Sequence, residues 1–292
     1  MEHASPSPLK RIRISPPDSP ETVKSDDFME ICIQRSLSIE KSRIKLSANE
    51  EYRQSVERVA GMIGKLRDAY SRNIPMMVSI HALVMSQVVI SLTKISFADA
   101  NSEFWIYVSM MCFKLSASFH GPMDVAVSDM LGILGYTHNI ENKETYKKVE
   151  RVYLKLTNWS LFFPTPVNFC DCIKEKNVEL DTPLGHIMTT CCTDEAVHGV
   201  LCFCLSKWDM LQYNFNSIAI SAIATILRLK SVSSEGYPDD GIIENIMGCD
   251  STIEGVQDCA KSVFYLVKEK LAANDKAKQN QTGCLGRVPL CE

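Results

Sequence analysis

Thiol and imidazole side chains crowd one stretch of the chain, and these are groups that bind zinc in proteins. The stretch contains Cys170, Cys172, Cys191, Cys192, His198, Cys202 and Cys204. Structural zinc sites favour the spacing Cys-x-x-Cys, which occurs nowhere in the chain. Cys202 and Cys204 lie in the apolar run VLCFCL, where a helix would point them to different sides. We therefore interpret these cysteines as core thiols, and we predict neither a metal site nor a cofactor.

The sequence carries none of the common motifs of catalysis. It contains no Gly-x-Ser-x-Gly, no phosphate-binding glycine loop and no His-Glu-x-x-His. The histidines inside the chain have no patterned acid or nucleophile beside them; they are His81, His120, His138, His186 and His198. The sequence therefore predicts a binding or regulatory protein and not an enzyme.

Serine-proline pairs near the start of the chain are candidate phosphorylation sites. The serines are Ser5, Ser7, Ser15 and Ser19. One of them, Ser7-Pro8-Leu9-Lys10, has the full target pattern of a cyclin-dependent kinase, and phosphate there would add roughly −1.5 to −2 charges. Such pairs also occur without function in disordered tails, but their density here favours phosphorylation. The nearby bases Lys10, Arg11 and Arg13 are either part of a nuclear import signal or ordinary solvated charges.

The composition is that of an ordinary globular chain. Of the 292 residues, 46% are hydrophobic and 23% are charged, and the net charge is −4. Strong attraction to nucleic acid would therefore need a local basic patch. The start has no apolar signal segment, and the apolar stretches 78–92 and 218–229 are shorter than the roughly 18–20 residues of a spanning helix. We expect a soluble intracellular protein with reduced thiols.

Apolar residues recur at steps of three and four, which is the period of an amphipathic helix. Such stripes run through residues 56–70, 104–115, 149–156 and 218–227. No alternating pattern typical of strands stands out. The sequence therefore predicts an all-α fold.

Prolines, glycines and polar tails divide this helical chain. Five prolines lie within the first 20 residues, so we predict a disordered tail over 1–27 and a flexible tail over 273–292. A helix is predicted near 28–44, and two final helices are predicted over 240–247 and 251–272. The break Phe-Phe-Pro-Thr-Pro separates about five helices from about five more.

The segment at this break, VERVYLKLTNWSLFFPTPVNF (149–169), resembles the junction between the two boxes of the cyclin family. The residues that match the cyclin pattern are Glu150, Leu154, Leu156, Trp159, Leu161, Pro164, Thr165 and Phe169. The segments FKLSASF, FNSIAISAIATI and YPDDGIIENIMGCD are similar to further cyclin segments in the same order. The resemblance implies two tandem five-helix cyclin boxes, over 50–161 and 162–272, behind an N-terminal helix and linker over 28–49.

The resemblance also implies a partner and the residues that would bind it. Cyclins hold the regulatory helix of a cyclin-dependent kinase in its active position. They grip it with a glutamate in the last helix of the first box, here Glu150, and with the lysine of a Lys-Phe-Glu-Glu motif. This chain keeps the phenylalanine as Phe119 but has Ser118 in place of the lysine. Lys114, one turn earlier on the same face, is the candidate replacement.

A second cyclin feature is an apolar patch on the first helix of the box, where substrates dock. The aligned residues are Val59, Met62, Ile63 and Leu66. The arginine and tryptophan of the usual pattern are absent, so the expected docking role is reduced.

Three functions remain open on this reasoning. The first is a cyclin-like regulator of a cyclin-dependent kinase in cell-cycle or meiotic crossover control. The second is a kinase-independent scaffold at meiotic recombination sites, in contact with chromosomal recombination proteins. The third, a cyclin-fold transcription factor, is disfavoured because no zinc ribbon or basic surface is present in the sequence. The first two place the protein in the nucleus, associated with chromosomes, with no sequence-specific nucleic-acid contact and no membrane contact.

Overall fold

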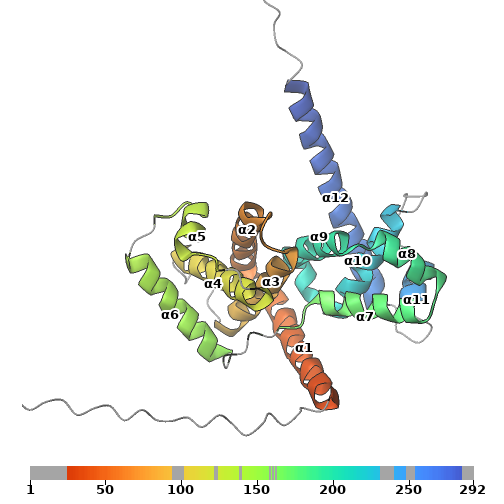
Figure 1. The fold of residues 1–292 in the computed structure, drawn as a ribbon, viewed down its shortest axis with the longest axis horizontal. Coiled ribbons are helices and arrows are strands. Elements are labelled where there is room, and N and C mark those ends of the chain that lie inside the picture. The colour runs from red at the N-terminus through yellow and green to blue at the C-terminus, as the bar shows by residue number, and fades with distance from the viewer. Residues whose placement is uncertain are drawn as a thin grey trace, which may run out of the picture.

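The computed structural model describes residues 25–93, 102–121, 124–137, 140–157, 159, 161, 163–230, 240–247 and 254–284. Within these residues every regular element is a helix, as predicted. The α-helices are α1 (Ser25–Ser47), α2 (Arg53–Tyr70), α3 (Met76–Thr93), α4 (Ser102–His120), α5 (Val127–Ile133), α6 (Ile140–Leu156), α7 (Pro166–Glu179), α8 (Pro183–Cys191), α9 (Asp194–Leu205), α10 (Phe215–Lys230), α11 (Asp240–Met247) and α12 (Glu254–Cys284). Two short 3₁₀ helices are η1 (Glu50–Tyr52) and η2 (Trp208–Gln212). Figure 1 shows α2–α6 on one side of α1 and α7–α12 on the other.

Each of these two groups has a helix that packs against most of its neighbours. In the first group, α4 contacts α2, α3 and α6, and its residues 105–113 are all buried. In the second group, α10 contacts α7, α8, α9, α11 and α12, and its residues 217–227 are all buried. Ala219, Ala222 and Ala224 are small enough for the surrounding helices to approach α10 closely.

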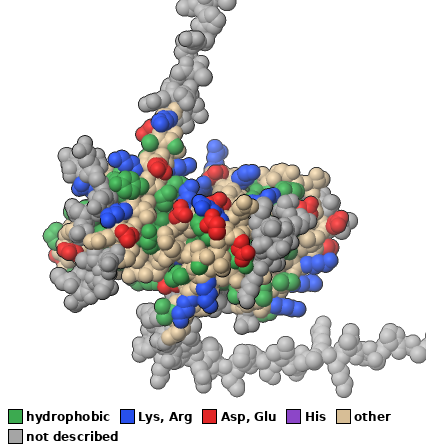
Figure 2. Space-filling view, turned by 180° about the vertical axis from the view of Figure 1, so that it is seen from behind, with side chains coloured by type: hydrophobic (Ala, Val, Ile, Leu, Met, Phe, Trp, Pro, Cys, Tyr) green, Lys and Arg blue, Asp and Glu red, His purple; other side chains and the backbone are tan. Residues whose placement is uncertain are grey.

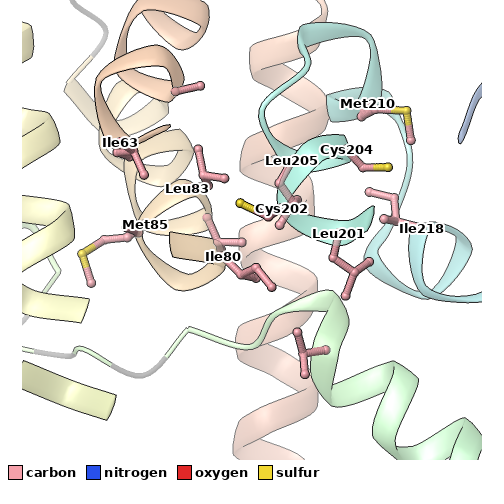
Figure 3. Close-up of a cluster of buried hydrophobic side chains, with 14 of the residues drawn as sticks. Ile63, Ile80, Leu83, Met85, Leu201, Cys202, Cys204, Leu205, Met210 and Ile218 are labelled. Carbon is pink, nitrogen blue, oxygen red and sulfur yellow. The ribbon is translucent and has the colours of Figure 1, made fainter. Parts of the chain in front are cut away.

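Helix α3 joins the two groups, because it packs against α1, α2 and α4 and also against α9. In Figure 3, Leu83 of α3 and Cys202 of α9 point toward each other across this junction, with Ile80 and Leu201 beside them. By length and composition α3 would suffice to cross a membrane, but 72% of it is buried inside the structure. Burial on all sides accounts for its apolar composition. Helix α3 is therefore longer than the apolar stretch 78–92 on which the sequence prediction was based.

Most of the helices near the two ends of the chain lie close to their predicted positions. Helix α1 covers the predicted range 28–44, and α11 spans the predicted range 240–247. Helix α12 runs to Cys284, past the predicted end at 272, and its side chains over 268–276 are exposed. It projects away from the body of the molecule in Figure 1. The predicted tail 1–27 lies outside the described residues except for its last three, which begin α1.

The second group contains six α-helices where the sequence suggests five. The extra boundary separates α8 from α9 at Thr193, whose side chain accepts a hydrogen bond from the N–H of Ala196. This is an N-cap, which starts a new helix and lets it leave in a new direction. On the back of the molecule, Figure 2 shows acidic and basic side chains interspersed, so neither sign dominates that face.

Candidate partner-binding surface

Glu150 lies on α6 at the edge of the contact between α6 and α4, and its side chain is partly buried. The hydroxyl of Tyr146, one turn earlier, donates a hydrogen bond of 3.0 Å to Glu150 Oε1. Burial and the nearby Glu150 carboxylate both raise the pKa of Tyr146, so the phenol remains a donor. The hydrogen bond therefore holds the predicted kinase-binding carboxylate in one orientation.

The C-terminal end of α4 presents Ser118 and Phe119 at the surface. Lys114 behaves differently, because it turns toward the loop between α4 and α5. Its Nζ donates to the carbonyl oxygen of Val125 at 3.0 Å and lies 3.4 Å from Asp124 Oδ1. The ammonium group could reach a partner only by giving up these contacts.

Phe119 belongs to a cluster of rings around His81, which comes from α3. The ring centroid of His81 lies 5.0 Å from that of Phe119, 4.9 Å from that of His120 and 5.8 Å from that of Phe163. His81 is buried, and neither ring nitrogen makes a well-formed hydrogen bond within the described part of the chain. Burial, aided by His120 and opposed in part by the backbone of Leu161, lowers the pKa of His81 to about 3. The cluster therefore joins a neutral imidazole on α3 to the end of α4 and to the linker before α7.

That linker leaves α6 through a turn that exposes Trp159. Its φ is 60°, in the left-handed region that residues other than glycine seldom adopt, and its N–H donates to the Leu154 carbonyl at 2.6 Å. The indole is 67% exposed. The linker ends where the Thr165 N–H donates to Asn168 Oδ1 at 2.9 Å and Pro166 begins α7. A tryptophan held outward by a strained turn is typical of a contact surface.

Other large apolar side chains stay exposed around the end of α6. We define the α6-end surface by Leu92, Phe119, Val152, Leu156 and Trp159. Leu156 and Val152 line a cavity of about 150 Å³ between α3, α4 and α6. Leu156 also lines a cavity of about 230 Å³ with Leu92 and Phe163. The His81 ring contacts the rings of both Phe163 and Phe119. Leu92, Val152 and Leu156 therefore border two cavities that share Leu156, and exposed apolar side chains grouped in this way are typical of an interaction surface.

The predicted substrate-docking patch is not on the surface. Its residues are all buried in the core; they are Val59, Met62, Ile63 and Leu66. The apolar stripe of α2 packs inward against α3 and α4, which corrects the expectation of an exposed patch. Of the four, Ile63 borders a surface cavity between α2, α3, α9 and α12, and the exposed apolar patch of the cyclin pattern is absent from this face of α2.

The remaining candidate residues do not meet at one site. The predicted phosphorylation sites Ser5, Ser7, Ser15 and Ser19 lie outside the described residues. Cys170, Cys192, Cys202 and Cys204 are buried, as expected of core thiols, whereas Cys172 is exposed and Cys191 is partly buried. Figure 3 shows Cys202 pointing toward α3 and Cys204 pointing the opposite way, as predicted. In the part of the chain that the structure describes, no group of three or more His, Cys, Asp or Glu is placed to hold a metal ion.

Arg43 on α1 is an important residue that sequence reasoning missed. Its guanidinium is fully buried and donates to Gln87 Oε1 at 2.7 Å, to the Tyr213 carbonyl at 3.1 Å and to the Met210 carbonyl at 3.4 Å. It also lies 4.4 Å from the centre of the Phe215 ring. Burial lowers the pKa of Arg43 to about 10, so the group stays charged at neutral pH. An amphipathic pattern would have placed this arginine on the solvated side of α1.

No family model matches the chain, and no curated protein shows a significant match to it.

Proposed function

We propose that the protein is a cyclin-like regulatory subunit that binds a cyclin-dependent kinase through the α6-end surface. It would direct or activate that kinase in the nucleus, in cell-cycle or meiotic crossover control. One observation carries the proposal: the segment 149–169 resembles the cyclin junction, and the same segment leaves Trp159 and its apolar neighbours exposed. Glu150 lies on the same segment, and its carboxylate is fixed by Tyr146.

The arrangement of helices supports the cyclin-box part of this proposal. Helices α2–α6 would form the first box around α4, and α7–α12 would form the second box around α10, with α8 and α9 taking the place of one helix. The boundary would fall in the linker between α6 and α7, close to the predicted limits of 50–161 and 162–272. Helix α1 would be the helix that precedes the first box.

A kinase-independent scaffold at meiotic recombination sites is the second candidate. It is favoured by the end of α4, where Ser118 is too short to replace a lysine and Lys114 is engaged by Val125 and Asp124. A charge-assisted hydrogen bond contributes roughly 1.5–3 kcal/mol, so its loss would weaken a kinase complex considerably. The apolar contacts of the α6-end surface would then serve a chromosomal protein instead.

The test is co-purification of the protein with a panel of cyclin-dependent kinases, followed by an activity assay on a Ser-Pro peptide. We expect one kinase to form a stable and active complex. A stable but inactive complex would support scaffolding of the kinase, and failure to bind any kinase would reject the first proposal.

A matched pair of variants locates the interface. Val152 on α6 and Val178 on α7 are exposed to almost the same degree, 56% and 54%. We expect Val152→Asp to weaken kinase binding at least about tenfold, because it places a charge in an apolar contact. Val178→Asp should bind as the wild type does. Equal binding by both variants would show that the α6-end surface is not the interface.

A further inference from the structure

A groove crosses the junction of the two helical groups on a different set of elements. A cavity of about 630 Å³ lies where α2, α3, α9 and α12 meet. An adjoining cavity of about 570 Å³ lies between α9, α10 and α12. The two cavities share Gly199, Phe203 and Lys270, so they form one continuous depression. We call it the α9 groove.

Three glycines inside helices line the first cavity: Gly61 and Gly64 on α2 and Gly199 on α9. A Cβ added at any of them would meet no atom within 4 Å, so packing within the described chain does not require glycine there. Each nevertheless costs its helix roughly 0.5–1 kcal/mol relative to alanine. The missing side chains leave room for the backbone of a bound segment to approach closely.

Lysines around the groove carry uncompensated charge. Lys207 Nζ lies 4.9 Å and Lys270 Nζ lies 6.0 Å from the centre of the Phe203 ring, and Lys230 lines the adjoining cavity. Among the described residues none of these three lysines forms an ion pair. Two ammonium groups beside one ring repel each other, and a carboxylate placed between them would relieve that repulsion.

The groove also offers one polar and one apolar feature to a ligand. Ser79 of α3 lines the first cavity, is 1% exposed, and has a hydroxyl without a hydrogen-bond partner in the described part of the chain. A buried hydroxyl of this kind normally has a partner. The second cavity is lined by apolar side chains, including Val200, Ile226, Leu229 and Leu271. Such a lining suits an apolar anchor.

Two carboxylates also line the groove, and they limit where acidic groups could bind. Glu57 lines the first cavity but pairs with Arg53 at 3.0 Å, pointing its charge along α2. Glu195 lines the second cavity. The unpaired positive charge therefore lies at Lys207 and Lys270, where the two cavities join, and at Lys230 in the second cavity.

We infer that the α9 groove binds an extended acidic peptide segment of a partner protein. An apolar side chain of the segment would enter the second cavity. Its carboxylates would meet Lys207 and Lys270, and its backbone would pass over the three glycines. This surface is separate from the α6-end surface, so the two partners could bind at once.

The test selects peptides from a displayed random library of 12-residue peptides on the full-length protein and measures their affinity by fluorescence polarisation. We expect the selected peptides to combine Asp or Glu with an apolar residue. The double variant Lys207→Glu/Lys270→Glu should weaken them at least about tenfold, and Gly61→Leu should do the same by filling the groove. The matched controls Lys176→Glu and Gly255→Leu, which lie outside the groove, should bind as the wild type does.

Several outcomes would overturn this inference. Failure to select any peptide, selection of basic peptides, or binding that all four variants preserve would each reject an acidic ligand in the groove. Displacement of the selected peptides by a synthetic peptide of residues 1–24 would assign the groove to the chain's own N-terminal segment. A dimer that the double lysine variant converts to a monomer would assign it to a second copy. Circular dichroism of each variant separates a lost site from a lost fold.

Discussion

At the scale of single residues, Arg43 shows how a buried charge can connect helices that are distant in the sequence. Its guanidinium joins α1 to Gln87 of α3 and to two carbonyls at η2, and Gln87 Nε2 in turn donates to the Leu205 carbonyl at the end of α9 at 2.8 Å. Burial of a charge is costly, and hydrogen bonds and the Phe215 ring offset that cost. Arg43 thus connects α1, α3 and η2 through these contacts.

Replacement of Arg43 by methionine should destabilise the protein by roughly 1–3 kcal/mol. Methionine keeps much of the side-chain volume but removes the donor to Gln87 Oε1 and to the Tyr213 carbonyl, whereas the Met210 carbonyl keeps the Tyr213 N–H. The measurement is the urea midpoint by circular dichroism. Arg53→Met, which breaks only exposed ion pairs, should leave the midpoint near the wild-type value. Equal midpoints for both variants would contradict a structural role for the buried charge.

His81 should make the protein less stable in acid. Its pKa is about 3 in the folded chain and 6.5 in the unfolded chain, so between these values the unfolded chain binds more protons. Stability therefore falls as the pH decreases from 6.5 toward 3, by about 2 kcal/mol between pH 7 and pH 5. Urea titrations at these two pH values measure the loss. His81→Phe keeps a ring but cannot titrate, and it should reduce the loss; the same loss in that variant would exclude His81 as its source.

At the scale of elements, the long helices were predictable and the breaks between short ones were not. Apolar residues at helical spacing predicted α2, α4, α6 and α10, of which α4 and α10 are buried on all sides over residues 105–113 and 217–227. The α8–α9 boundary lies between two apolar segments, so periodicity does not reveal it, and only the Thr193 cap marks it.

The candidate surface was predictable in part for a similar reason. The cyclin resemblance singled out Glu150 and Phe119, and their role in binding a kinase stays a prediction. The exposure of Trp159 depends on one left-handed residue, and the burial of Arg43 depends on carbonyls 167 and 170 residues away. Such long-range contacts leave no local pattern in the sequence.

Two glycine-to-alanine substitutions should have opposite effects on helix packing. At Gly185 of α8, an added Cβ would overlap the Asn177 carbonyl oxygen and lie 2.8 Å from its carbon, so α7 and α8 would be forced apart. We expect Gly185→Ala to destabilise the protein by roughly 1–3 kcal/mol. Gly64→Ala meets no atom and should stabilise it by roughly 0.5–1 kcal/mol. Thermal melting measures the change in stability of each variant, which should be a loss for Gly185→Ala and a gain for Gly64→Ala. A loss of stability in Gly64→Ala would mean that α2 needs glycine for a reason other than space.

At the scale of the whole molecule, contacts of different chemistry hold the two helical groups together. Among them are the apolar junction of α3 with α9 and the Arg43–Gln87 network, through which α1 contacts α3 and η2. Both contacts cross between the groups, so opening one group exposes apolar surface and buried polar groups of the other. We therefore expect the groups to unfold together.

The tryptophans allow this coupling to be measured in one sample. Trp105 is buried in α4 of the first group and Trp208 is buried in η2 of the second. The chain has three tryptophans, so labelling with 5-fluorotryptophan gives three ¹⁹F resonances, and a urea titration follows each group separately. The Trp105 and Trp208 midpoints should coincide in the wild type and move apart in Arg43→Met. That variant removes the guanidinium hydrogen bonds between the groups, but it keeps the apolar junction and the hydrogen bonds of Gln87 to Leu205 and of Phe215 to Glu40. Separate midpoints in the wild type would mean that α3 and α9 pack too weakly to couple the groups. Coincident midpoints in Arg43→Met would mean that the remaining contacts couple them without the guanidinium.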